Sequence, residues 1–166
     1  MEQSMDPQAF RRAMGMFATG VTVLATEVEG NIHGMTANAF SSLSLDPPLI
    51  LVCLNRGTKM EGLLKHRAKF SVNMLSRDQE ALSRHFAGGH GNQHTPEFRF
   101  TAFAGVPQLE GCLCTVACEV YDVLEGGDHV IVLGRVFGLD TASGETEPLL
   151  FWKGKYHALQ SPVASA

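Results

Sequence analysis

Three consecutive segments decide the fold class of this chain: Val21-Thr-Val-Leu-Ala-Thr-Glu-Val28, Glu29-Gly30-Asn31 and Gly34-Met-Thr-Ala-Asn-Ala-Phe-Ser-Ser-Leu-Ser44. The first is rich in β-branched residues, which pack well on a pleated strand. The second is typical of a tight turn between antiparallel strands. The sequence therefore predicts a β-hairpin, with the polar third segment as its return strand.

The polar segment has an unusual distribution of hydrogen-bonding groups. With the period of two of a strand, one face would carry Thr36, Asn38, Phe40, Ser42 and Ser44, and four of these five residues can hydrogen-bond. A buried polar group without a partner costs roughly 1 to 3 kcal/mol, so the four groups need partners. A solvated sheet face is the commoner way to supply them. A bound flat polar ligand is the alternative.

Other segments indicate further short antiparallel strands. Leu49–Leu54 is continuously apolar, which predicts a central strand buried on both faces. A strand around Cys112–Leu124 meets the turn Glu125–Asp128 and returns as His129–Phe137. The remaining strands are expected at Lys69–Leu75 and in a last hairpin over Pro148–Leu159. About seven strands with few helices predict a mainly β chain that forms a small barrel.

Short helices are expected beside these strands. Asp6-Pro7 predicts the start of a capped helix that ends near Thr19-Gly20. Thr58 and Glu61 have the spacing of a capping box, and Ser76–Gln79 has the same pattern at the start of a helix that runs through Phe86.

The helix that starts at Thr58 is a candidate anion site. Its first turn would present backbone N–H groups and a positive dipole end, and Arg56 and Lys59 add positive charge beside it. A plain capped helix with solvated cations is the other interpretation of the same residues.

Composition and charge limit the function classes. The 166 residues suit a single domain, expected over 1–160, with a disordered tail at 161–166. A formal charge of -4 with scattered Lys and Arg gives no basic surface for nucleic acid. No run approaches the roughly 20 apolar residues of a membrane span, and the first residues do not resemble a targeting signal. A cytoplasmic protein with reduced thiols is expected.

Neither the cysteines nor the histidines indicate a metal site. Extended spacing would spread the sulfurs apart, and no nearby histidine completes a zinc tetrahedron. The alternate spacing instead predicts that one side of a strand carries three small buried side chains, Cys112, Cys114 and Cys118. A polar, Gly-rich segment at Ala87–Pro96 predicts a mobile loop that could act as a lid, and in or beside it lie His85, His90 and His94.

Taken together, four groups of residues resemble the flavin reductase family: Phe10–Val23, His33–Phe40 with Ser42–Leu45, Gly127–Ile131 and Gly154–His157. The likeness covers roughly residues 8 to 159, in order and with matching gaps, and it is specific as a set. Members are small NAD(P)H-dependent partners of two-component flavin monooxygenases, such as those that hydroxylate phenol or 4-hydroxyphenylacetate. The resemblance implies a split β-barrel with a few short flanking helices, which forms a homodimer with flavin sites near the subunit interface.

The resemblance also implies a set of binding residues. The isoalloxazine would be lined by Gly34, Met35, Thr36, Ala37 and Asn38, and flanked by Phe86 and Ala87. The ribityl or phosphate region would be met by Ser42 and Ser44, with Thr58 and Lys59 at the phosphate, and Cys53 and Asn55 complete the flavin-binding set. His129 and Tyr156 would approach the nicotinamide. No catalytic acid or base and no metal ligand is implied.

The activity that follows from the resemblance is an NAD(P)H:flavin oxidoreductase. It would reduce FMN or FAD with NADH or NADPH and supply the reduced flavin to a separate oxygenase component. Two other classes stay open. One is a flavin-binding or carrier barrel without catalysis, and the other is an oxidase of the pyridoxamine-phosphate type, although the basic cluster that its substrate requires is not evident.

Overall fold

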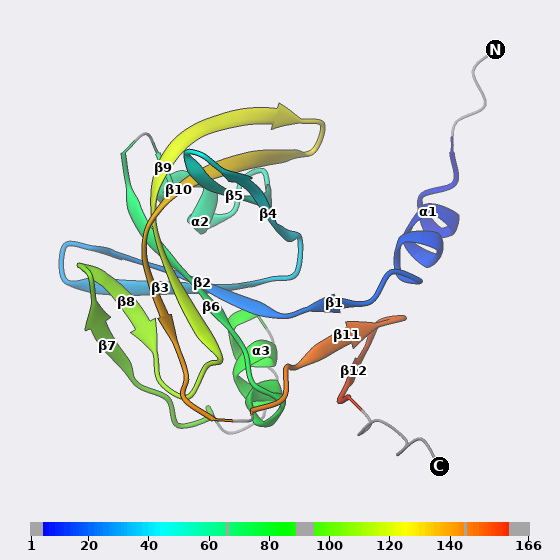
Figure 1. Ribbon diagram of the computed structural model, residues 1–166. Coiled ribbons are helices and arrows are strands. Elements are labelled where there is room, and N and C mark those ends of the chain that lie inside the picture. Colours follow the sequence, from blue (N-terminus) through cyan, green and yellow to red (C-terminus); the bar gives the residue numbers. More distant parts are fainter. Residues whose placement is uncertain (1–4, 66, 89–94, 145, 160–166) are drawn as a thin grey trace.

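The computed structural model of the chain describes residues 5–65, 67–88, 95–144 and 146–159 (Figure 1). Its helices are α1 (Pro7–Met14), α2 (Lys59–Leu63), the 3-10 helix η1 (Arg77–Gln79) and α3 (Glu80–Phe86). Its strands are β1 (Thr19–Gly20), β2 (Thr22–Val28), β3 (Asn31–Ala37), β4 (Phe40–Leu45), β5 (Pro48–Asn55), β6 (Lys69–Met74), β7 (Phe100–Phe103), β8 (Val106–Leu109), β9 (Cys114–Gly126), β10 (His129–Thr141), β11 (Leu150–Trp152) and β12 (Lys155–His157). The expectation of a mainly β chain with short flanking helices is confirmed.

Seven strands form one antiparallel sheet in the order β3-β2-β6-β9-β10-β5-β4. The sheet curls until β3, at one edge, also contacts β5, next to the other edge, which makes the predicted barrel. Two smaller sheets lie outside it, β1-β11-β12 and the β7-β8 hairpin. The predicted hairpins β2–β3, β9–β10 and β11–β12 are all present.

Hydrophobic side chains occupy both sides of the sheet. The interior of the barrel is filled by one cluster that includes Leu24, Val52, Leu54, Phe70 and Val132, all less than 2% exposed. A second cluster, with Val23, Leu75 and Leu109, packs the outer surface of the sheet against α3, β8 and β11. The candidate site therefore lies against a sheet whose two faces are both packed.

The polar segment is not one strand, and this expectation was wrong. β3 ends at Ala37 and pairs with β2, whereas β4 begins at Phe40 and pairs with β5 at the opposite edge of the sheet. Asn38 and Ala39 cross between the two edges. The period of two could not reveal this break, because the crossing changes the pairing partner and leaves the residue pattern unchanged.

A bulge in β4 also separates two serines that strand alternation would place on one face. Ser42 pairs with Ile50, but Ser44 pairs with Leu49, and the shift of register between them falls at Leu43. Because Ile50 and Leu49 are successive residues of β5, their partners point to opposite sides of the sheet. Ser42 and Ser44 therefore do not share a face.

The N-terminal helix is shorter than predicted. Asp6 caps it as expected, accepting hydrogen bonds from the Gln8 and Ala9 backbone N–H groups, but α1 ends at Met14. The predicted end near Thr19-Gly20 is wrong because these two residues form β1, which pairs with Phe151 and Leu150 of β11. Long-range pairing thus replaces the last turn of the predicted helix.

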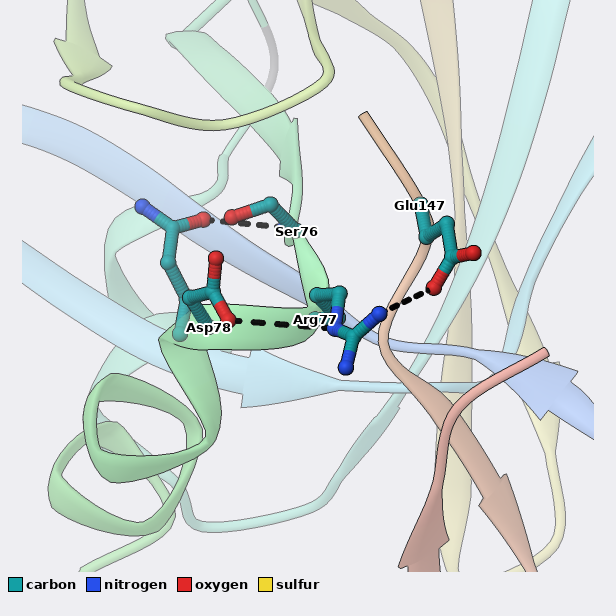
Figure 2. A network of polar contacts seen from close by, with 5 residues as sticks. Ser76, Arg77, Asp78 and Glu147 are labelled. Atoms are coloured by element: carbon teal, nitrogen blue, oxygen red, sulfur yellow. Dashed lines mark hydrogen bonds and ion pairs between the residues drawn. The ribbon is translucent and has the colours of Figure 1, made fainter. Parts of the chain in front are cut away.

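A short network connects η1, which leads directly into α3, to the segment that precedes β11 (Figure 2). Arg77 donates to the Glu147 carboxylate at 2.6 Å, and its backbone N–H donates to the Glu147 carbonyl at 2.9 Å. The predicted capping box is present, with the Gln79 side chain accepting from the Ser76 N–H at 3.0 Å. These contacts hold α3 and the β11–β12 hairpin next to each other.

The cysteines are confirmed as free thiols, but they do not all point to one side. Cys118 is buried in the barrel interior and Cys114 packs against the same cluster. Cys112 precedes β9, and its sulfur lies 3.3 Å from the Thr115 hydroxyl on the other side of the sheet. Burial raises the pKa of Cys118 to about 12 and raises that of Cys112, so both remain protonated at neutral pH.

One buried asparagine anchors the β7–β8 hairpin, whose strands were not predicted from the sequence, to the barrel. Asn73 is fully buried, and its amide nitrogen donates to the Val23 carbonyl at 3.1 Å and to the Ser71 hydroxyl at 2.9 Å. Its amide oxygen accepts from the Leu109 N–H and from the Thr115 hydroxyl, each at 3.0 Å. All four hydrogen-bonding positions of one side chain are therefore used.

Replacing Asn73 with alanine should lower the free energy of unfolding by about 3 kcal/mol or more, because several buried groups lose their partner at once. Urea denaturation of wild-type and variant protein measures this difference. Asn31→Ala, at an exposed turn, is the matched control and should change stability by less than about 0.5 kcal/mol. Similar losses in the two variants would contradict the role of Asn73.

Candidate functional site

A cavity of about 160 Å³ lies where β3 ends, between the sheet, α3 and the β11–β12 hairpin. Five residues of the implied binding set line it: Thr36, Ala37, Asn38, Ala87 and Tyr156. Val21, Ser83 and Phe151 complete the wall. Residues from four separate segments of the sequence are thus brought together at this cavity.

Hydrogen bonds fix the polar groups of the cavity in place. The Thr36 hydroxyl donates to the Ser83 carbonyl at 2.7 Å, and the Tyr156 and Ser83 hydroxyls lie 2.8 Å apart. The Asn38 amide donates to the Thr19 hydroxyl at 3.3 Å. On the barrel side, the Thr22 hydroxyl donates to the Ala37 carbonyl at 2.6 Å. The cavity wall is therefore uncharged and mainly apolar, and its few polar side chains are held in place by α3 and β1.

Gly34 lies beneath α3 because only a glycine leaves room for Phe86. A Cβ atom on residue 34 would come within 2.6 Å of two atoms of the Phe86 ring. Phe86 in turn makes edge contacts with Phe98 and Phe100, at centroid distances of 5.0 and 6.0 Å. Gly34 therefore sets how closely the helix approaches β3. Met35, its neighbour in the implied set, packs against the barrel interior instead.

A larger cavity of about 350 Å³ adjoins the first one. The two share Val21 and Asn38, and the larger is lined in addition by β1, Phe40, Leu75, Leu113 and the segment Pro148-Leu149. Its volume reaches the lower end of the range for small-molecule sites, about 300 Å³. Asn38 stands between the two spaces, so a flat ligand in either one would meet its amide.

The implied ribityl and phosphate residues lie on β4, β5 and α2, beyond the crossing. The Cys53 N–H donates to the Ala39 carbonyl at 2.9 Å, which places this part of β5 next to the crossing. Cys53 is only half-buried, so β5 is not buried on both faces as expected. Ser42, on the edge strand β4, is exposed, and Asn55 is exposed at the end of β5.

The loop from Asn55 to Glu61 uses most of its own polar groups. The Thr58 hydroxyl donates to the Asn55 carbonyl at 2.9 Å and accepts from the Glu61 N–H at 3.3 Å. The Glu61 carboxylate accepts from the Gly57 N–H at 2.8 Å. The capping interaction is confirmed, but it occupies two of the N–H groups that an anion would need. Because α2 has five residues, its dipole also contributes little.

Arg56 and Lys59 differ in their surroundings. The Arg56 side chain donates to the Gly127 carbonyl at 3.1 Å and forms an ion pair with Glu125, so it is attached to the β9–β10 turn. Lys59 is exposed and makes no ion pair with any residue that the structure describes. Lys59 is thus the cation of this loop that a ligand could reach.

His129 begins β10 beside the same loop, paired with Asn55. Its Nδ1 lies 2.7 Å from the Asp128 carboxylate, and this hydrogen bond lowers the pKa of Asp128. The β9–β10 turn and β12, which carries Tyr156, lie well apart in Figure 1. One chain therefore does not bring the two implied nicotinamide residues together.

Comparisons with known proteins agree on one family. The model of the flavin reductase like domain matches residues 14–160. The chain belongs to the flavin reductase family. It is 41% identical to an NADH-dependent flavin reductase of a Rhodococcus species, over 96% of this chain and 90% of the relative. It is 37% identical to the NADH-dependent flavin reductase StyB of Pseudomonas fluorescens, over 96% and 94% of the two chains.

Solved structures of family members share the fold of this chain. The flavin reductase PheA2 in its native state is 42% identical and superposes with a TM-score of 0.87, over 95% of this chain and all of the other. The split-barrel architecture implied by the sequence is therefore confirmed, and the cavities at Asn38 belong to a flavin reductase fold.

Two features of this family member were not found from the sequence. Ser83 and Thr19 both contact residues of the implied set, but neither belongs to a recognisable motif. Ser83 occupied an ordinary position in a predicted helix, and Thr19 was assigned to the wrong element. Only the pairing of β1 with β11 and the docking of α3 on β3 reveal them.

A metal centre finds no support in the described part of the chain, where no three His, Cys, Asp or Glu residues are grouped to hold an ion. His85 packs against the Phe86 and Phe98 rings. His90 and His94, most of the predicted lid and the predicted tail lie outside the described residues. None of the helices in the described ranges has the length and apolar character needed to span a membrane.

Gly34→Ala should destabilise the protein by about 1 to 3 kcal/mol, because the added methyl group overlaps the Phe86 ring. Thermal or urea unfolding measures the loss. Gly20→Ala is the matched control, since nothing lies within 4 Å of the Cβ position there. A shorter side chain should relieve the overlap, so Phe86→Leu combined with Gly34→Ala should recover part of the stability. No recovery would contradict the steric explanation.

Proposed function

We propose that this chain is an NAD(P)H-dependent flavin reductase that reduces FMN or FAD and supplies the reduced flavin to a separate oxygenase component. The observation that carries the proposal is its near full-length similarity to NADH-dependent flavin reductases, combined with the cavity that the implied residues form at Asn38. A relative from Thermus thermophilus, 36% identical, is the reductase component of 4-hydroxyphenylacetate 3-monooxygenase, which supports an oxygenase partner.

The donor set of the cavity fits a flavin ring. An isoalloxazine presents carbonyl and ring-nitrogen acceptors, which need neutral hydrogen-bond donors and flat apolar contacts. The hydroxyl of Tyr156 and the amide of Asn38 supply polar groups, and Val21, Ala37 and Phe151 supply apolar surface. No charged side chain lines this cavity among the described residues, so the ring would meet a neutral wall.

When bound, the flavin accepts a hydride from the nicotinamide, so the two cofactors carry the chemistry and no protein acid or base is needed. The task of the chain is to hold the rings in stacking geometry and to exclude water. The Ala37 carbonyl accepts from the Thr22 hydroxyl and the Ala39 carbonyl accepts from the Cys53 N–H, so the crossing is fixed on both sides and Asn38 has a defined position against the ring.

We assign the flavin phosphate to the neighbourhood of Lys59. The Thr58 hydroxyl is occupied by its capping bonds, and Arg56 is occupied by the β9–β10 turn. Lys59 is the other cation of the loop from Asn55 to Glu61 and makes no ion pair with a described residue, so it would carry most of the preference for FMN or FAD over riboflavin.

Steady oxidation of NADH by the purified protein should require added FMN or FAD, because the flavin is the group that accepts the hydride. Stopped-flow absorbance on mixing the flavin-loaded protein with NADH tests this directly. Bleaching with turnover supports the reductase. A protein that binds flavin tightly and does not bleach is a carrier, and oxidation of pyridoxamine phosphate would indicate the third class.

Lys59→Ala should weaken the binding of FMN more than the binding of riboflavin. Equal losses of affinity for the two would remove Lys59 from the phosphate site.

We also propose that the protein is a homodimer. Four apolar side chains on and after α1 are each more than half exposed: Phe10, Met14, Met16 and Phe17. Helix α1 buries none of its residues in the single chain and extends away from the barrel in Figure 1. An eight-residue helix is marginal in water by itself, so its apolar face needs a covering surface. A second copy would provide it, and would allow His129 of one chain and Tyr156 of the other to serve one nicotinamide.

Phe10→Glu should shift the protein from dimer to monomer, because it places a charge in the proposed contact. Size-exclusion chromatography with light scattering measures the mass over a range of concentrations. Gln8→Glu adds the same charge to an exposed position of the same helix and should leave the dimer intact. A wild-type protein that is monomeric at all concentrations would overturn the proposal.

A further inference from the structure

Ser83 places a side-chain hydroxyl at the base of the 160 Å³ cavity. This hydroxyl has one hydrogen-bond partner among the described residues. Its side chain is 0% exposed, and its Oγ lies 2.8 Å from the Tyr156 hydroxyl. No other partner for this Oγ occurs among the described residues. Tyr156 is half-buried and lines the cavity. The two hydroxyls therefore form an isolated pair, with one member buried and the other at the ligand space.

The direction of this hydrogen bond follows from the cost of burial. Two hydroxyl groups carry two hydrogens, but the contact between them uses only one. If Tyr156 donated, the hydrogen of Ser83 would be buried without an acceptor, at a cost of roughly 1 to 3 kcal/mol. If Ser83 donates, the hydrogen of Tyr156 is the free one, and it faces the cavity. The second arrangement is favoured.

Two neighbouring side chains pack against the Tyr156 ring where it lines the cavity. Phe151 contacts it edge-on at a centroid distance of 5.3 Å and an interplanar angle of 64°. The Arg84 guanidinium lies over the ring, 4.7 Å from its centroid. Glu80 accepts two hydrogen bonds from Arg84, at 2.9 and 2.6 Å. The orientation of the phenol is thus supported by Phe151 and by Arg84, which Glu80 holds in place.

We propose that Ser83 is a positioning residue that makes Tyr156 a hydrogen-bond donor to a carbonyl oxygen of the bound substrate. Ser83 donates to the phenol oxygen, and the phenol hydrogen points into the cavity. This inference rests on the proposed function for the identity of its ligand. The carbonyl belongs either to the isoalloxazine or to the carboxamide of the nicotinamide, which share the acceptor chemistry that Tyr156 requires.

Ser83→Ala isolates this link from the rest of the site. The Thr36 hydroxyl bonds to the backbone carbonyl of residue 83, so that contact survives the substitution. The variant removes only the hydroxyl that fixes the polarity of Tyr156. Tyr156→Phe removes the proposed donor itself. The matched control is Tyr121→Phe, since Tyr121 is the other tyrosine of the chain and lies on the outer side of β9.

The test measures the Kd for FMN by fluorescence quenching, the Kd for NADH by direct titration, and kcat and KM for the reaction. Each of Ser83→Ala and Tyr156→Phe should weaken one ligand by 2- to 10-fold, as expected for one net hydrogen bond, with kcat changed less than KM. The ligand that weakens identifies the carbonyl. The double variant should bind no more than about 2-fold worse than Tyr156→Phe, because Ser83 acts only through Tyr156.

Three outcomes would overturn the inference: unchanged affinity for both ligands in Ser83→Ala, losses that multiply in the double variant, or an equal loss in Tyr121→Phe. If Ser83→Ala does not fold, Tyr156→Phe alone decides, and wild-type affinity for both ligands refutes the donor role. The two binding measurements do not depend on turnover. A wild-type protein that binds FMN but leaves NADH unoxidised would therefore refute the proposed function separately.

Discussion

The structure depends on the way the chain closes its barrel at Asn38-Ala39. Two residues connect strands that lie at opposite edges of a seven-stranded sheet, so β3 and β4 must approach each other there. The connection is fixed on one side by the Thr22–Ala37 hydrogen bond and on the other by the Cys53–Ala39 bond. Both crossing residues are exposed, and Asn38 lines the two cavities. The closure of the barrel therefore places a polar side chain where a ligand can reach it.

The second wall of the site is built by elements distant in sequence. Helix α3 approaches β3 as closely as Gly34 permits, and the Arg77–Glu147 contact holds the β11–β12 hairpin against the same helix. Ser83 faces both elements, because its carbonyl bonds to Thr36 and its hydroxyl bonds to Tyr156. The geometry of the cavity is thus set by the rigid packing of one seven-residue helix.

Much of the fold could be predicted because its signals are local. The turns at 29–30 and 153–154 adopt positive φ values that glycine favours, and the caps at Asp6 and Thr58 bond within three residues. What could not be predicted is non-local. Whether Ser42 and Ser44 share a face depends on a bulge in the pairing with β5. Whether Cys112 shares a face with Cys114 and Cys118 depends on where β9 begins, and Cys112 lies before that strand.

The binding residues show the same contrast between what the sequence indicates and what only the folded chain reveals. The resemblance to flavin reductases named Thr36, Asn38, Ala87 and Tyr156, and the structure brings them to one cavity. It could not name Ser83, because a serine inside a helix carries no signal until its partner in β12 is known. His129 and Tyr156 were implied for a single nicotinamide, yet one chain holds them at different ends of the molecule.

The attachment of Arg56 to the β9–β10 turn has a consequence for how long a ligand stays. With that guanidinium paired to Glu125, a phosphate group beside the loop from Asn55 to Glu61 would be attracted mainly by the exposed ammonium of Lys59. An exposed ion pair of this kind contributes only about 0 to 1 kcal/mol and is screened by salt over a Debye length of about 8 Å at physiological ionic strength. Dissociation of the flavin would therefore accelerate as ionic strength rises. Weak retention of this kind suits a flavin that is reduced here and then used by another enzyme.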